Sequence, residues 1–424
     1  MGTILRKPDK AEAMNQNGNE VARVLYITYD GLMEPLGQSQ VFQYLRNLAR
    51  EHDITLVSYE KPQDWSDIAQ RHEVIDKARQ AGIRWVPLGY HKRPTAPATA
   101  YDLAVGLIVC AYLVLRYRIQ IVHARSYVPS VVALSLKRIF GTRFIFDMRG
   151  FWPDEKVEGG HWSKESRLYK VAKWFEQHFL TQADVVVSLT HAGVATMREF
   201  PYLQEQMPRF EVIPTCTNLE IFHPSLSAQT GQNKAFTLGY VGTVGNWYLF
   251  DPALECFKIL REIRPDAQML IVNRGEHTYI RERLAAHGIS EDWVEIKTVA
   301  WSKVVEEMSR MDAGIFFIKP VYSKRGSAAT KLGEFLGCGI PCLSNAGVGD
   351  MEKILEGEDV GVVLREFSQP AQAVAVQQLL ELVADAQIRE RCVAVARRYF
   401  SLEDGVESYN RIYQYVKSES SQLN

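Results

Sequence analysis

Several patterns that would assign this chain to a simple class are missing. The formal net charge of its 424 residues is −1, so no excess of basic charge points to nucleic acid as a partner. The six cysteines lack the spacing of zinc ligands or CxxC motifs and suit a reducing cytosol. No HExxH, Walker loop or Ser/His/Asp motif occurs. The common metalloprotease, P-loop and serine hydrolase classes are therefore excluded.

Long apolar runs are also scarce. Residues 1–20 are polar, and we expect a flexible leader there and no secretory signal. The membrane-like stretch at 101–115 has fifteen residues, whereas a membrane-spanning helix needs about 20. We therefore expect a buried helix there and no transmembrane segment. The interpretation is a cytoplasmic protein, with 101–115 as the stretch for peripheral contact with the inner face of the membrane.

The chain does contain a regular alternation of short β-branched runs with helical patterns. This alternation is typical of doubly wound parallel sheets, and the length exceeds one ordinary core. Strands are predicted at 24–29, 54–59, 85–88, 119–123, 143–147, 184–189 and 211–213, and again at 238–241, 268–272, 294–296, 314–318, 341–344 and 361–364. Such folds bind ligands where the strands end.

A polar stretch divides this alternation into two halves. We predict an α/β protein with two Rossmann-like domains facing across a cleft. Its parts are a leader at 1–20, an N-terminal domain at 21–222, a linker at 223–236, a C-terminal domain at 237–400 and a final helix at 401–418. That helix is amphipathic, so it needs another surface, and we expect it to pack back towards the N-terminal domain.

Each half opens with a strand, a glycine loop and a helix. Gly37 and Gln38 belong to the first loop, and Gly242 and Thr243 to the second. Glycine lets backbone approach a ligand, and a helix N-terminus offers N–H groups to a phosphate. Neither loop is a complete GxGxxG, so a tight structural turn explains each about as well.

The strongest motif lies between 316 and 341. A predicted strand ends in a loop with three cations, small residues follow, and a helix then begins at Thr330. This combination suits a diphosphate. Lys331 and Glu334 share one face of the helix, so both can reach one ligand. The alternative is a solvated charged loop with a Lys–Glu pair on the surface.

This motif resembles the nucleotide-sugar-binding region of family 4 glycosyltransferases, which are retaining enzymes of the GT-B fold. The glycine loops and the segments 121–126, 146–155 and 212–224 are also similar, and the resemblance covers about residues 22–418. It implies transfer of a hexose from a nucleoside diphosphate sugar to a glycan or lipid-linked acceptor, in polysaccharide or glycoconjugate biosynthesis. No cofactor is implied beyond the donor substrate.

The resemblance and the residue types together give a set of candidate site residues. The C-terminal domain is expected to bind the donor, with Glu334 on the ribose, through Gly242, Thr243, Arg274, Lys319, Lys324, Arg325, Ser327, Thr330, Lys331 and Glu334. The N-terminal domain is expected to bind the acceptor through Gly37, Gln38, Arg125, Asp154 and Glu155. The predicted catalytic residues are Asp147, Arg149 and Lys331. A local ion cluster would explain Asp147, Arg149, Asp154 and Glu155 about as well.

The sequence departs from the family pattern in three ways. Gly326 stands eight residues before Glu334, where the family often has a sugar-binding glutamate, and Arg149 stands where a histidine is common. The arginine and lysine often found after the second glycine loop are also missing. No Asp-x-Asp motif occurs, so we expect no metal site and a metal-independent enzyme. The alternatives are a nucleotide-sugar 2-epimerase of the same fold and an inactive subunit that binds a nucleotide sugar or glycan.

Overall fold

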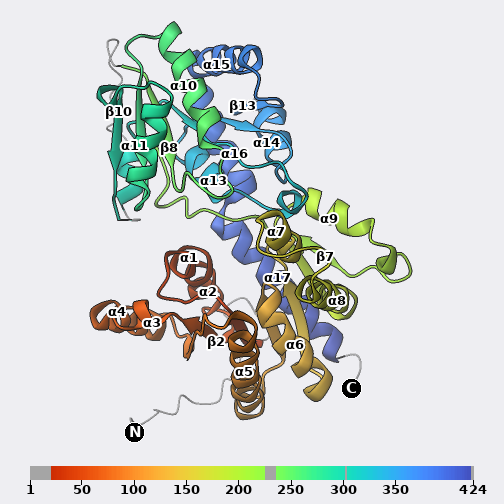
Figure 1. Ribbon diagram of the computed structural model, residues 1–424. Coiled ribbons are helices and arrows are strands. Elements are labelled where there is room, and N and C mark those ends of the chain that lie inside the picture. Colours follow the sequence, from red (N-terminus) through yellow and green to blue (C-terminus); the bar gives the residue numbers. More distant parts are fainter. Residues whose placement is uncertain (1–20, 225–234, 301–302, 422–424) are drawn as a thin grey trace.

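The computed structural model describes residues 21–224, 235–300 and 303–421. They form two α/β domains, each built around a parallel sheet (Figure 1). The predicted leader and most of the predicted linker, residues 225–234, lie outside the described residues. The predicted fold class of two Rossmann-like domains is confirmed.

The N-terminal sheet has seven strands in the order β3-β2-β1-β4-β5-β6-β7. Its central strands are almost wholly buried because helices cover both faces, which explains their continuous apolar runs. The strands are β1 (Arg23–Thr28), β2 (Asp53–Glu60), β3 (Arg84–Gly89), β4 (Ile121–Arg125), β5 (Arg143–Asp147), β6 (Val185–Ser188) and β7 (Phe210–Val212).

Two groups of helices cover this sheet. Core residues on one face come from α2, α4 and the final helix, and core residues on the other come from α5, α6, α8 and α9. The helices are α1 (Pro35–Gly37), η1 (Gln38–Phe42), α2 (Gln43–Leu48), α3 (Pro62–Trp65), α4 (Ile68–Gln80), α5 (Thr95–Tyr117), α6 (Tyr127–Phe140), α7 (Trp152–Glu158), α8 (Arg167–Gln182), α9 (His191–Arg198) and η2 (Pro201–Leu203).

The C-terminal sheet has six strands in the order β10-β9-β8-β11-β12-β13. They are β8 (Thr237–Val241), β9 (Gln268–Val272), β10 (Val294–Lys297), β11 (Ala313–Ile315), β12 (Cys342–Asn345) and β13 (Gly361–Leu364). The helices of this domain are α10 (Phe250–Ile263), α11 (His277–Ala286), η3 (Glu291–Trp293), α12 (Val304–Met308), η5 (Tyr322–Gly326), α13 (Thr330–Gly337), α14 (Met351–Gly357), α15 (Gln369–Ala384) and α16 (Ile388–Phe400).

The last helix, α17 (Leu402–Ser421), follows the C-terminal domain but packs on the N-terminal one, as predicted. The chain crosses between the domains where the Thr217 N–H donates to the Phe400 carbonyl at 2.7 Å and the Leu402 N–H donates to the Thr217 carbonyl at 3.2 Å. Tyr413 of α17 is wholly buried among N-terminal core residues. The core of the N-terminal domain therefore includes residues of α17.

The apolar helix is longer than the fifteen residues predicted at 101–115, so the prediction of its length was wrong. These residues belong to α5, which has 23 residues and is long and apolar enough, by length and composition, to cross a membrane. Only 33% of its most apolar window is buried. The helix was expected to be buried, and in fact one side packs in the core while Ile108 and Leu115 are 72% and 66% exposed.

Candidate active site

The helix α13 begins where the sequence predicted, at Thr330. It follows Ala329, whose side chain cannot cap a helix, and no side chain among the described residues donates or accepts at this cap. The first N–H groups of an α-helix lack partners within the helix, and the helix dipole places partial positive charge beside them. The start of α13 is therefore suited to an anionic group such as a phosphate.

Lys331 lies beneath the glycine loop of the C-terminal domain. Its Nζ is 3.8 Å from the centre of the Tyr248 ring and 5.1 Å from that of Tyr240. A Cβ added at Gly242 would come within 3.2 Å of this Nζ, so glycine allows the loop to approach it. The side chain is 7% exposed, and its Nζ has no hydrogen-bond partner among the described residues. The alternative of a Lys–Glu pair on the surface is therefore wrong.

Burial dominates the electrostatics of Lys331 and Glu334. Loss of solvent lowers the pKa of Lys331 to about 7, although Glu334 partly opposes this shift. Loss of solvent also raises the pKa of Glu334 to about 7, against the effect of Lys331. Both groups therefore titrate near neutral pH, where a bound anion or a hydroxyl donor can change their protonation.

Polar side chains hold the glycine loop in place from below. Gly242 has a φ of 98°, which strongly favours glycine. The Asn273 amide donates to the Gly242 carbonyl at 3.0 Å and to Glu276 at 2.8 Å, and Glu276 accepts from the Val244 N–H at 3.1 Å. Thr243 is exposed beside them. The loop is thus preorganised with its exposed face available to a ligand.

The predicted donor cations do not all remain free. Lys324 is 7% exposed, pairs with Glu155 of α7 at 3.1 Å and lies 4.0 Å from the centre of the Trp247 ring. The carbonyl of Arg325 accepts from the Thr190 hydroxyl at 2.6 Å, while its side chain is exposed. Lys324 and Glu155, assigned to donor and acceptor, therefore contact each other and join the two domains.

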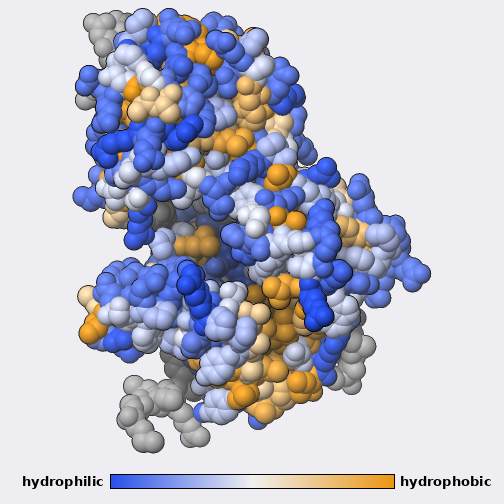
Figure 2. Space-filling model, viewed as in Figure 1, coloured by the Kyte–Doolittle hydropathy of each residue, from blue (hydrophilic) through white to orange (hydrophobic). Residues whose placement is uncertain are grey.

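Further hydrogen bonds join the two domains on the side of the cleft where Lys324 meets Glu155. Asp350 of the C-terminal domain accepts from the N–H groups of His191 and Ala192 at 2.7 and 2.9 Å, at the start of α9. The Ser323 N–H donates to Glu158 at 3.1 Å. Figure 2 shows that the surface between the two domains remains hollowed on the other side. Arg274 and Lys319 are exposed on the C-terminal domain.

Gly326 lies against the N-terminal domain. A Cβ added there would lie 3.1 Å from the Phe151 ring and 3.3 Å from the Cα of Gly150. The neighbouring Ser327 carbonyl packs against Gly349 so closely that a Cβ there would be 2.3 Å away. A side chain at Gly326, such as the glutamate that the family often carries, would therefore require Phe151 or the Gly150 backbone to shift.

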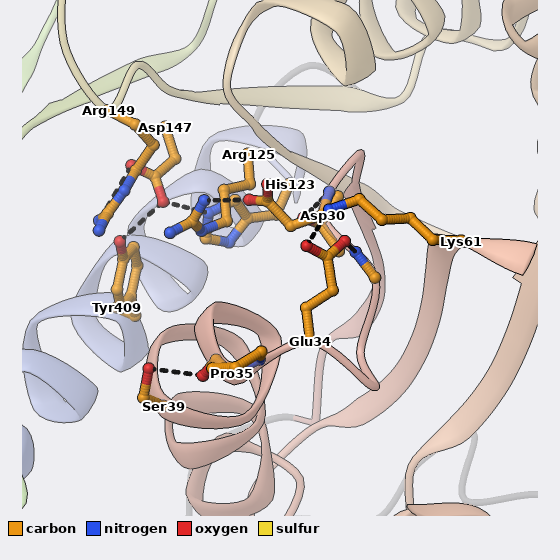
Figure 3. Close-up of polar contacts among 12 residues, drawn as sticks. Asp30, Glu34, Pro35, Ser39, Lys61, His123, Arg125, Asp147, Arg149 and Tyr409 are labelled. Carbon is orange, nitrogen blue, oxygen red and sulfur yellow. Dashed lines mark hydrogen bonds and ion pairs between the residues drawn. The ribbon is translucent and has the colours of Figure 1, made fainter. Parts of the chain in front are cut away.

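The floor of the N-terminal side is a buried charge cluster (Figure 3). Asp147, at the end of β5, accepts from the Tyr409 hydroxyl of α17 at 3.0 Å, and its other oxygen lies 3.8 Å from Arg149. Burial opposes ionisation of Asp147, but the positive charge of Arg149 and the imidazole of His123, whose Nε2 lies 3.6 Å from the carboxylate, outweigh it and hold the pKa of Asp147 below its ordinary value. Asp147 is therefore ionised, and it orients Arg149, whose φ of 60° is uncommon for a residue with a side chain.

The neighbouring strand end presents a second ion pair. Arg125, the last residue of β4, donates to Asp30 at 2.7 Å and is 5% exposed (Figure 3). Because β4 and β5 are adjacent and parallel, Arg125 and Asp147 are paired in register. The structure therefore brings Arg125, Asp147 and Arg149 to one edge of the sheet.

The other predicted acceptor residues have structural partners. A Cβ at Gly37 would lie 2.0 Å from the Gly31 carbonyl, so this glycine permits a tight turn. The Gln38 amide donates to the Leu32 carbonyl at 2.7 Å. Asp154 accepts from Tyr169 at 2.8 Å and from Lys173 at 3.1 Å, both on α8. These contacts favour the structural turn for Gly37 and the local ion cluster for Asp154.

Several residues of the site were missed from the sequence. Asn273 directly follows β9, and Glu276 comes three residues later. Their position after the end of a strand could have marked them as site residues, because α/β sheets bind ligands there. Tyr240 and Tyr248 surround Lys331 on either side of the glycine loop. Tyr409 reaches Asp147 from α17, and no local pattern indicates that contact.

Comparisons with known proteins agree with this arrangement. Residues 38–215 match the family model of a glycosyl transferase 4-like domain. Sucrose-phosphate synthase from Thermosynechococcus elongatus is similar with a TM-score of 0.68 and 15% identity, over 94% of this chain and 100% of its own. HepE from Anabaena in complex with UDP and glucose has a TM-score of 0.64 and 14% identity, over 92% of this chain and 99% of its own.

A third similar structure is WaaG, a glycosyltransferase involved in lipopolysaccharide biosynthesis, with a TM-score of 0.61 and 13% identity over 93% of this chain and 99% of its own. No curated protein sequence matches the chain. These similarities show that the chain has the fold of the GT-B glycosyltransferases. More particularly, residues 38–215 match a glycosyl transferase 4-like domain, and this match confirms the predicted resemblance to family 4.

Proposed function

We propose that this protein transfers a hexose from a nucleoside diphosphate sugar to a glycan or lipid-linked acceptor, with retention of anomeric configuration. The observation that carries the proposal is the uncapped start of α13 beside the buried Lys331 and the half-buried Glu334, at the edge of a GT-B cleft. A similar structure, HepE, holds UDP and glucose, which supports a nucleotide sugar as the donor.

The residues suggest how the leaving diphosphate is stabilised. The N–H groups at the start of α13 and the ammonium of Lys331 meet its negative charge in a site with little solvent. Arg274 and Lys319 add positive charge from exposed positions. In retaining transfer on the donor's front face, the leaving phosphate takes the acceptor's proton, so no protein base is required at the anomeric carbon.

The N-terminal domain is the proposed acceptor side. Arg125, Asp147 and Arg149 lie at the edge of its sheet, where open α/β sheets bind ligands. An arginine can hold a phosphate or carboxylate through two parallel hydrogen bonds. We propose that the protein works in the cytoplasm at the inner face of a membrane, in polysaccharide or glycoconjugate biosynthesis.

A second function is favoured by one observation. The packing of Gly326 against Gly150 and Phe151 fills the place where a sugar-binding glutamate is common in the family. An inactive subunit that binds a nucleotide sugar would have this property. The active enzyme would instead recognise the hexose through other groups or after the domains separate.

The proposed function is tested with a panel of nucleotide sugars, UDP sugars first. A thermal shift identifies the donor, and product analysis with and without glycan acceptors follows. Transfer to an acceptor, with the anomeric configuration kept, is expected. A stabilising donor that is neither hydrolysed nor transferred would support the inactive subunit, and epimerisation at C2 without acceptor would support the 2-epimerase.

We predict that transfer does not need a divalent metal. The sequence holds no Asp-x-Asp motif, and cations and helix N–H groups are available to balance the charge of the diphosphate. The rate with identified donor and acceptor is expected to stay unchanged in excess EDTA. A complete loss that manganese restores would contradict this prediction.

A further inference from the structure

The outer side of α5 and the end of α6 form one continuous apolar surface. Figure 2 shows hydrophobic residues gathered over these two helices. The exposed large members on α5 are Tyr101, Ile108, Tyr112 and Leu115, at 59%, 72%, 61% and 66%, and Ile139 of α6 is 62% exposed. A contiguous patch of this kind on a folded domain marks a contact with a partner or a membrane.

The charged residues around this surface are mainly basic. Between residues 91 and 146 the sequence has eight basic residues and one acidic residue, Asp102. Three of the basic residues pair with acidic groups from elsewhere in the chain, Arg125 with Asp30 and both Lys137 and Arg143 with Asp184. Asp102 is 1% exposed and accepts from the Tyr29 hydroxyl at 2.8 Å, so it adds no acidic group to the surface. The α5 and α6 helices lead into adjacent parallel strands, so their ends lie at the same edge, where Arg116, Arg118 and Arg138 are exposed.

The packing of α5 favours a helix that lies on a bilayer over one that crosses it. Its inner side places Cys110, Leu113 and Val114 in the core shared with α6, and Asp102 is held by Tyr29 and His91. A crossing helix would have to leave this core and carry Asp102 into hydrocarbon. An amphipathic helix with basic residues beside its apolar face instead lies in the interface.

We propose that the surface formed by Tyr101, Ile108, Tyr112, Leu115 and Ile139, with the cations at its edge, docks the N-terminal domain on a bilayer that contains anionic lipids. The apolar side chains enter the interface, and Arg116, Arg118 and Arg138 meet the headgroups. Charge complementarity favours the bilayer over a second copy of this chain, because two copies facing each other here would bring like charges together. The docking rests on the proposed function for its place at a membrane surface, but none of these residues belongs to the proposed active site.

Sedimentation of the whole chain with vesicles tests this proposal. We expect binding to vesicles of equal parts phosphatidylcholine and phosphatidylglycerol, weaker binding to phosphatidylcholine alone, and a loss of the difference at high salt. The variant Ile108→Gln/Leu115→Gln is expected to bind on the order of tenfold more weakly. Each of Arg116→Gln and Arg138→Gln is expected to weaken binding to the anionic vesicles about fivefold.

The matched control is Ile263→Gln/Val374→Gln, which removes two exposed apolar side chains of the C-terminal domain, 43% and 58% exposed. It should bind vesicles like the unchanged protein. Circular dichroism and nucleotide binding verify that each variant is folded. Failure of the unchanged protein to bind either vesicle, or equal binding by the surface and control variants, would overturn the proposal. So would a dimer that the Ile108→Gln/Leu115→Gln variant dissociates.

Discussion

Replacing Glu334 with alanine is expected to weaken the binding of nucleoside diphosphates and nucleotide sugars about tenfold to a hundredfold. The ionised carboxylate of Glu334, in the second turn of α13, can accept from both ribose hydroxyls. Such charge-assisted bonds contribute about 1.5–3 kcal/mol. A bare nucleoside should lose a similar factor because it carries the same ribose. Calorimetry with nucleoside, nucleoside diphosphate and nucleotide sugar measures all three affinities.

Two further variants sharpen this test. Glu334→Gln keeps the shape and one accepting oxygen, so its loss should be smaller than that of the alanine variant. Glu381→Ala removes an exposed glutamate of α15 and should leave binding unchanged. If folded Glu334→Ala protein binds the nucleoside as tightly as the unchanged protein, Glu334 does not contact the ribose.

A second large effect is expected from Lys331, and it depends on pH. In the free protein its pKa is about 7, and a bound diphosphate favours the protonated form, so binding takes up a proton above pH 7. Diphosphate affinity should therefore fall as pH rises from about 7 towards 9, by up to about tenfold per unit. Calorimetry in buffers of different ionisation enthalpy measures the proton uptake directly.

The variant Lys331→Met isolates this contribution. Methionine suits the aromatic surroundings of Tyr240 and Tyr248, and it removes the charge without leaving a large cavity. Diphosphate binding should weaken about tenfold to a hundredfold at pH 7, and nucleoside binding should change little. The decline in affinity that Lys331 causes above pH 7 should disappear. The decline that protonation of Glu334 causes should move to higher pH, because Lys331 lowers the pKa of Glu334 in the unchanged protein. A decline above pH 7 that persists in this variant would assign it to another group.

The same burial affects folding stability. The pKa of Lys331 in the unfolded chain is the ordinary 10.5, so between about pH 7 and 10.5 the unfolded state binds more protons than the folded state. The free energy of unfolding therefore gains a term that rises with pH across this window. Lys331→Met should lack that term.

Local patterns in the sequence predicted much of the fold. The bounds predicted for β5, β9 and β13 are those observed, because short apolar runs between turn signals define buried parallel strands. The helix α16 was missed although it is amphipathic. The predicted apolar stretch fell short of the full α5 because its first turns contain Pro97 and small residues, which look like a loop but are compatible with a helix start.

The candidate site was less predictable because its contacts join distant parts of the chain. Lys324 meets Glu155, 169 positions earlier, so a loop that looks free in sequence is held by the other domain. Tyr409 and Asp147 are 262 positions apart. Burial of Lys331 depends on Tyr240 and Tyr248, whose approach follows from the course of the glycine loop. Sequence spacing predicted the residue types of the proposed donor site, but it could not predict these long-range partners.

The crossing of α17 has a consequence for synthesis of the chain. The ribosome releases the N-terminal sheet long before the residues that complete its core, since Tyr409 and Tyr413 follow the whole C-terminal domain in the sequence. Until then, one face of that sheet exposes apolar side chains to water. The N-terminal domain of a nascent chain should therefore complete its core only after α17 is made, and a premature stop within α17 should destabilise that domain.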